Sequence, residues 1–179
     1  MVLRCYNCNA MPYVPNIRNY KPFYIETASD SGAWDTREYG LIAQTQPYPD
    51  NIETKEPFKN EWFDEHGDDE YVAETYYKSF EFTVKFFIKY VRSVSETPIN
   101  VINGLKKQFR DKIKSGYFKV YDSWQDVGYR NVRFVSDNVE QRYVSDDSAW
   151  MIFSVTFKVD DPATKVTLNG EEIIVIPDS

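Results

Sequence analysis

Two cysteines are the residues of this chain with the best-known metal and redox chemistry. Cys5 and Cys8 form a CxxC. A structural zinc site needs four ligands, and the only other candidate of the usual kind is His66, the single histidine. A redox CxxC normally lies where a strand meets a helix in a βαβ unit, and the sequence predicts no such unit here. We therefore interpret the thiols as structural or incidental, with zinc shared between subunits and a redox role as the alternatives.

Carboxylates form the second group of candidates. Six of them cluster within ten residues: Glu61, Asp64, Glu65, Asp68, Asp69 and Glu70. A calcium loop alternates its ligands and ends in a bidentate Glu, and this cluster does not have that spacing. A glycosidase needs two carboxylates facing each other across a sugar, a pairing that a sequence cannot show. Because charge runs usually face water, we predict a solvated acidic loop, with a hydrolase site as the alternative.

The motifs of nucleophilic and nucleotide chemistry are absent from the sequence. His66 lies inside the acidic cluster, and no GxSxG or Cys–His arrangement accompanies it. Neither GxGxxG nor GxxxxGK[ST] occurs. We therefore expect a protein that is not an enzyme, and we assign no catalytic, cofactor-binding or metal-binding residue.

Tryptophan side chains could instead line a sugar-binding face. The four are Trp34, Trp62, Trp124 and Trp150. Aromatic residues at such spacings belong more often to a core or an interface. A carbohydrate-binding module that uses exposed aromatic residues is therefore the alternative function.

Composition limits the class of protein. A chain of 179 residues is one domain by the usual prior and can bury a proper core. Its net charge of −7 argues against nucleic acid as a direct, sequence-specific partner, because phosphate binding needs a concentrated basic surface. No apolar run approaches the roughly 18–20 residues that cross a bilayer, and the N-terminus has no continuous apolar segment like that of a signal peptide. We expect no membrane association and folding in a cytoplasm.

Prolines dominate the first third of the chain, which we predict to be an irregular arm over residues 1–60. They interrupt any long helix or inner strand: Pro12, Pro15, Pro22, Pro47, Pro49 and Pro57. Short strands are predicted at 21–27 and 38–45, as a hairpin with a turn at 29–35. Residues 61–179 are predicted to form the core, within a single domain overall.

Regular patterns begin near residue 76. Apolar residues alternate with polar ones over 80–90, except at Phe87, which predicts a long strand with one buried face. A helix is predicted over 97–115, because Thr97 suits the N-cap and Pro98 the first helical position. Its apolar stripe consists of Ile99, Ile102, Leu105, Phe109 and Ile113. Gly116 ends it, and we expect its basic side to be solvated.

The rest of the chain is predicted to be β-structure. Strands are expected at 117–121, 127–135, 139–144 and 150–159, with a break at 136–138. A last hairpin turns at Asn169-Gly170. The fold class is therefore α+β and mainly β: an antiparallel β-sandwich or partly closed barrel with one flanking helix.

The order of these elements, together with a few short sequence segments, resembles the pattern of a known protein family. The acidic, glycine-bearing turn at 65–71 precedes Tyr77 and the long strand from Phe80, and the helix follows at 98–115. The phrase GYFKVYD at 116–122, a strand at 130–135 and FSVTFKVDDP at 153–162 complete the pattern. Over roughly residues 60–165 the chain resembles the tail-tube and distal-tail proteins of long-tailed bacteriophages and related prophages.

The resemblance implies a structural role without catalytic residues. A protein of this kind assembles with itself into a ring, a hexamer where the family pattern holds, and contacts other tail proteins in the virion tail. It would be made in the cytoplasm of the bacterial host. The first 60 residues match nothing in the pattern. The chain also stops soon after its closing hairpin, so we expect a one-domain version or a tube subunit.

Overall fold

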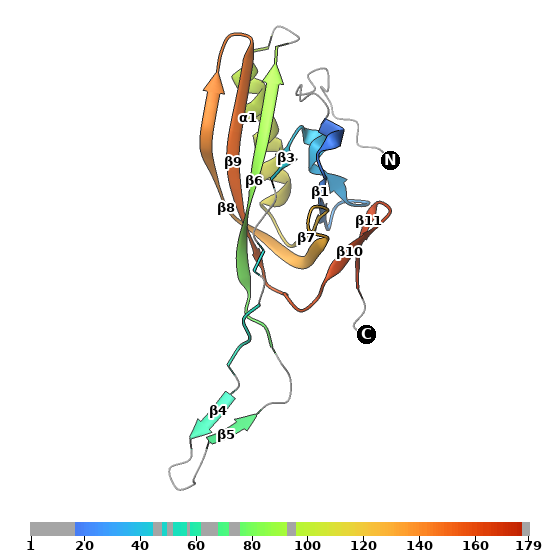
Figure 1. The fold of residues 1–179 in the computed structure, drawn as a ribbon, viewed down its shortest axis with the longest axis vertical. Coiled ribbons are helices and arrows are strands. Elements are labelled where there is room, and N and C mark those ends of the chain that lie inside the picture. The colour runs from blue at the N-terminus through green and yellow to red at the C-terminus, as the bar shows by residue number, and fades with distance from the viewer. Residues whose placement is uncertain are drawn as a thin grey trace.

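The computed structural model describes residues 17–44, 48–49, 52–56, 58–61, 68–71, 76–92 and 96–176. Most of this part is β-structure, and its main feature is one antiparallel sheet in the order β2-β1-β7-β8-β9-β6-β3, with a single helix beside it (Figure 1). The sheet does not close into a barrel. The predicted fold class, mainly β with one flanking helix, is confirmed in its open, sandwich-like form.

The first strands are shorter than the sequence suggested. The described part begins with the short 3-10 helix η1 (Ile17–Asn19) and strand β1 (Phe23–Thr27), which confirms the strand predicted at 21–27. The turn predicted at 29–35 ends in the two-residue strand β2 (Trp34–Asp35), which pairs with β1.

The strand predicted at 38–45 is wrong for most of its length. Its first residues belong to the 3-10 helix η2 (Thr36–Tyr39), and only β3 (Ile42–Ala43) is extended. Asp35 starts this helix by accepting a hydrogen bond from the backbone N–H of Arg37, and Gly40 ends it at a φ of 70°. The predicted hairpin partner is also wrong, because β3 pairs with β6 and not with β1. Residues 23–43 thus supply strands to the same sheet as the rest of the chain.

Two long strands form the middle of the sheet, as the alternation predicted. Strand β6 (Phe80–Val91) pairs with β9 (Ser148–Val159) along its whole length, from Phe80 opposite Val159 to Val91 opposite Ser148. Every second residue of β6 from Phe82 to Tyr90 is buried, and the same holds in β9. One face of this pair therefore belongs to the core.

Strand β8 (Val127–Val144) corrects the prediction of two strands separated at 136–138. Ser136, Asp137 and Asn138 stay paired with β9. The register shifts on both sides of them, between Phe134 and Ser136 and again between Val139 and Gln141. Two bulges thus absorb the irregular residues, so the strand bends without ending.

Helix α1 (Pro98–Ile113) begins after Thr97 and buries Ile102, Phe109 and Ile113 against the sheet, as predicted. Its basic side is not simply solvated. Lys106 forms an ion pair with Asp137 of β8. Lys112 Nζ lies 3.0 Å from Asp30 Oδ1 and 4.6 Å from the ring centre of Trp34. Long lysine stems can cover apolar surface while their amines reach acids at its border, a pairing that helical spacing alone does not reveal.

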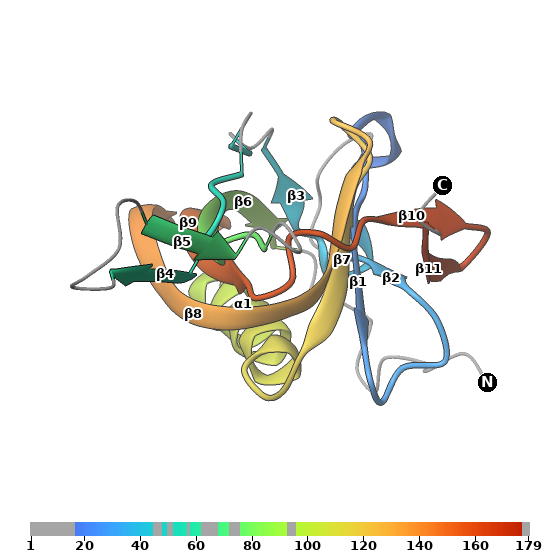
Figure 2. The same ribbon diagram turned by 90° about the horizontal axis from the view of Figure 1, so that it is seen from below.

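The core lies inside the bend of the sheet. Strand β8 curves from β9 round to β7 (Phe118–Asp122), so that β1 and β7 face β6 and β9 (Figure 2). Ring centroids connect the two sides: Phe23 lies 6.0 Å from Phe86 and 6.5 Å from Phe157. Phe109 of α1 lies 5.1 Å from Phe86, so the helix covers the remaining side of the core.

Two hairpins lie outside the main sheet. The pair β4 (Phe58–Glu61) and β5 (Asp68–Tyr71) projects far from the body (Figure 1). The C-terminal pair β10 (Val166–Asn169) and β11 (Glu172–Val175) confirms the predicted last hairpin. Its turn is Gly170-Glu171, one residue later than expected, because Asn169 pairs with Glu172 and Gly170 takes the positive φ of 64°.

Candidate assembly surface

Several residues singled out in the sequence lie outside the described part: Cys5, Cys8, Trp62, Asp64, Glu65 and His66. The other four carboxylates belong to the projecting hairpin, where the register sets Glu61 opposite Asp68. Among the residues that the structure describes, no three His, Cys, Asp or Glu side chains are grouped so that they could hold a metal ion.

The three tryptophans that the structure describes do not form one face. Trp34 is buried between Tyr39 and Phe109, at ring distances of 5.1 and 6.0 Å, so it belongs to the core, as expected for most of these aromatic residues, and not to a sugar-binding platform. Trp150 is half-buried and Trp124 is 45% exposed.

An aromatic strip does cross the outer face of the sheet, made by Tyr143, Trp150 and Phe87 on the adjacent strands β8, β9 and β6. The rings of Tyr143 and Trp150 are nearly parallel, with an interplanar angle of 15° and centroids 6.0 Å apart. Phe87 follows at 6.3 Å from Trp150. Of these three residues, the sequence pointed only to Trp150 as a candidate for a binding face. The available signal was Phe87, which, with Val91 at the strand end, is apolar on the otherwise polar face of β6.

The strip continues into a groove of about 410 Å³ beside β3. Tyr20, Phe87 and Trp124 are its aromatic walls, and Ile42 and Ala43 also line it. Lys21 Nζ lies 5.8 Å from the ring centre of Trp124. The outer face therefore carries partly exposed aromatic surface from β8 to the far edge of the sheet.

A buried acid fixes the turn that presents Trp124. Asp122 Oδ1 accepts a hydrogen bond of 2.8 Å from the backbone N–H of Trp124, while the residue is only 2% exposed. Burial raises the pKa of Asp122 above its ordinary value, against the lowering effect of that bond. Burial likewise raises the pKa of the Tyr48 hydroxyl, and nearby Asp122 adds to it.

The C-terminal half of β8 is a strand edge that no described strand covers. Strand β7 pairs with β8 only as far as Val132, whereas β9 pairs with it to Val144. From Arg133 onward, no described residue is paired with the other side of β8. The side chains from Ser136 to Val144 are mostly exposed.

The hydrogen bonds of the β8–β9 turn show which main-chain groups face this edge. Ser145 N–H donates to Ser148 O at 2.8 Å, and main-chain direction alternates along a strand. Tyr143 and Gln141 therefore bond to β9, while Arg142 and Val144 turn their N–H and C=O groups outward. These outward groups are free to pair with another strand.

Strands β6, β9 and β8 form a three-stranded slab, with β6 on the side opposite β8. The main chain of β6 also lacks a described partner near its C-terminal end. Strand β3 pairs with β6 only at Phe86 and Phe87, and Gln44 N–H donates to Lys85 O at 2.9 Å. By the same alternation, Lys89 and Val91 direct their main-chain groups away from β9. No described strand pairs with them. Figure 1 shows β6, β9 and β8 side by side, with β6 and β8 running in the same direction.

Side-chain pairs hold this three-stranded slab in shape. Lys85 of β6 reaches across β9 to Glu140 of β8 at 2.9 Å. On the inner face, Asp137 of β8 pairs with Lys106 and lies 3.9 Å from Arg110. At the tip, Arg92 N–H donates to Asp147 O at 2.7 Å. The edges are thus presented by an already ordered sheet.

No protein-family model matches this chain, and no curated protein matches its sequence. Across the described ranges, none of the helices has the length and apolar character needed to cross a membrane.

Proposed function

We propose that this protein is a structural subunit that assembles with itself, head to tail, into a ring. One observation carries the proposal: among the residues that the structure describes, no strand other than β9 pairs with Arg142 and Val144 of β8 or with Lys89 and Val91 of β6, which lie on opposite sides of the β6–β9–β8 slab. The β8 edge of one copy can therefore pair with the β6 edge of the next, through main-chain hydrogen bonds.

The geometry of this joint is compatible with a closed ring. The two edges differ, so the contact is heterologous, and such contacts produce rings when the rotation between copies closes. Strands β6 and β8 both run antiparallel to β9, and hence parallel to each other, so the joint is a parallel pair. Every copy keeps the same direction around the ring, as cyclic symmetry requires.

The biological setting of the proposal is the tail of a long-tailed bacteriophage or related prophage. Its support is the resemblance in element order over residues 60–165. Other tail proteins would be further partners, and the projecting β4–β5 hairpin offers a second contact. A net charge of −7 suits a tube whose wall repels passing DNA. The proposal includes no catalytic site, cofactor or membrane.

The test is the solution mass over a range of concentrations, measured by light scattering after size exclusion. The wild-type chain is expected to form rings or stacks. Arg142→Pro removes an outward N–H and blocks strand addition without removing a bond to β9, so it should remain monomeric. Arg142→Ala controls for the loss of the side chain and should assemble. A wild-type monomer at every concentration would overturn the proposal.

A carbohydrate-binding module remains the second candidate, favoured by the aromatic strip. The nearly parallel rings of Tyr143 and Trp150 form a surface on which the apolar face of a sugar ring can stack. Titration of soluble polysaccharides should then change tryptophan fluorescence, and Tyr143→Ala should abolish the change. Tyr117→Ala, an exposed tyrosine outside the strip, is the control. An unchanged signal over the full titration would eliminate this candidate.

A further inference from the structure

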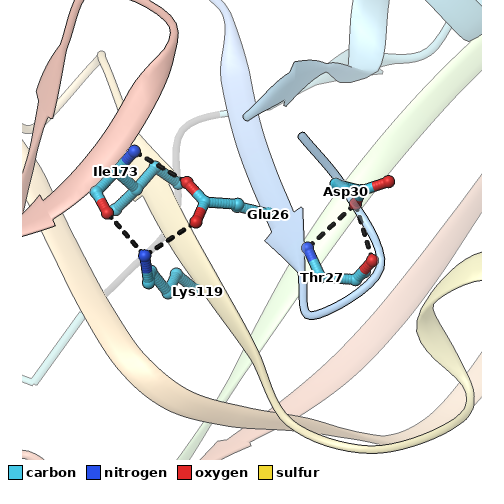
Figure 3. A network of polar contacts seen from close by, with 5 residues as sticks. All are labelled: Glu26, Thr27, Asp30, Lys119 and Ile173. Carbon is cyan, nitrogen blue, oxygen red and sulfur yellow. Dashed lines mark hydrogen bonds and ion pairs between the residues drawn. The ribbon is translucent and has the colours of Figure 1, made fainter. Parts of the chain in front are cut away.

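The C-terminal hairpin is held against the body by a contact that involves its main chain. Strand β11 lies beside the outer face of β1 and β7, where Glu26 and Lys119 project (Figure 3). Glu26 Oε2 accepts a hydrogen bond of 2.8 Å from Ile173 N–H, and Lys119 Nζ donates one of 2.7 Å to Ile173 O. The two side chains also pair with each other at 2.7 Å. Together they supply one donor and one acceptor to the same residue, as a neighbouring strand would.

The bonded groups belong to the outer edge of the hairpin. Asn169 pairs with Glu172 next to the turn, and Ile176 N–H donates to Lys165 O, so residues 172, 174 and 176 bond to β10. Ile173 and Val175 therefore direct their main-chain groups away from β10, toward the body. Glu26 and Lys119 form hydrogen bonds with the main-chain N–H and C=O of Ile173.

The loop after β1 reinforces this contact. Asp30 Oδ2 accepts hydrogen bonds from the N–H and hydroxyl of Thr27, at 2.9 and 2.6 Å, which fixes the turn (Figure 3). Further along, Ala33 N–H donates to Glu171 O at 2.6 Å. Val166 and Ile173 of the hairpin are buried, while Ile174, Val175 and Ile176 are exposed.

We propose that Glu26 and Lys119 form a catch that keeps the edge of β11 covered, and that opening it lets β11 pair with the open β8 edge of a second copy. Charged side chains that occupy an edge are a common way to prevent unwanted strand pairing. The hairpin forms a separate two-stranded sheet, and among the described residues one isolated β-bridge, between Tyr129 and Lys165, joins this end of the chain to the main sheet. The partner is a second copy whose β8 edge is not yet paired with a neighbouring β6, so an opened β11 competes with β6 for that edge. Only this last step rests on the proposed assembly.

Hydrogen exchange at the Ile173 amide tests the catch directly. Glu26→Met removes the acceptor while keeping the length of the side chain. Exchange at Ile173 should become about tenfold faster or more, the effect expected for losing a hydrogen bond to a charged group. Glu53→Met, which removes one partner of the exposed Lys78–Glu53 pair, is the matched control and should leave this amide unchanged. Unchanged exchange in Glu26→Met would overturn the catch.

Solution mass tests the pairing step in Glu26→Met/Lys119→Met. This double variant should associate at lower concentration than wild type. Adding Val175→Pro, which blocks the edge of β11 only, should return association to the wild-type level. Adding Arg142→Pro, which blocks the β8 edge used by both joints, should make the variant monomeric. Faster exchange without extra association would overturn the pairing step. A monomeric wild type with faster exchange in Glu26→Met would contradict the ring proposal while supporting the catch.

Discussion

Asp122 shows how one side chain connects the core to the surface groove. Its carboxyl is almost fully buried, yet one oxygen accepts the N–H of Trp124 and so orients a groove wall. Burial disfavours the charged form and raises the pKa. The folded protein therefore holds this proton at pH values where the unfolded chain, with a pKa near 3.8, has released it. The contribution of Asp122 to stability must fall as the pH rises through that window.

Asp122→Asn should remove this pH dependence. The amide oxygen can still accept from Trp124, and no charge has to be buried. The free energy of unfolding at pH 7 is expected to stay equal or rise, while the gain on acidifying from neutral pH, present in wild type, should shrink. Urea unfolding at several pH values measures both. A variant with a marked loss of stability at pH 7 would show that the carboxylate is needed in its charged form.

At the scale of elements, two glycines have opposite surroundings. A Cβ on Gly128 of β8 would lie 2.6 Å from Val166 Cγ2 and 2.9 Å from Val120 O. The terminal hairpin and β7 therefore pack too closely on this residue to leave room for a side chain. A Cβ on Gly104 of α1 would meet no atom within 4 Å. The first glycine permits close packing between elements, and the second only weakens a helix.

Gly128→Ala should therefore destabilise the fold by about 1–3 kcal/mol, as overpacking usually does. Gly104→Ala should stabilise it by roughly 0.5–1 kcal/mol, because glycine is a poor residue in a helix interior. Thermal and urea unfolding of both variants provide the measurement, each serving as the control for the other. Equal effects of the two changes would contradict the close contact between β8 and β10.

At the scale of the whole molecule, long-range charge and main-chain pairing oppose each other. Every copy carries a net charge of −7, which repels other copies in dilute buffer. The proposed joint consists mainly of backbone hydrogen bonds, which salt screens little. Salt should therefore affect assembly only by screening the charge repulsion between copies.

Self-association should strengthen as salt is raised from about 20 mM to about 500 mM, because the Debye length falls from roughly 20 Å to a few ångströms. Sedimentation velocity at a fixed protein concentration can follow the change. Arg142→Pro should stay monomeric at both ionic strengths. Association that weakens with salt would instead indicate a joint made by opposite charges, such as the acidic projecting hairpin on a basic surface.

Elements whose signal is local could be predicted from the sequence alone. The alternation in β6 and β9, the stripe and N-terminal residues of α1 and the terminal hairpin follow from side-chain periodicity, proline and glycine. Features that depend on a partner far away in the sequence became visible only in the tertiary structure. The partner of β3, the continuation of β8 through residues 136–138, the burial of Trp34 and the pairing of Lys106 with Asp137 are examples. The open edges belong to this second group, since a strand edge is open only when no other part of the fold covers it.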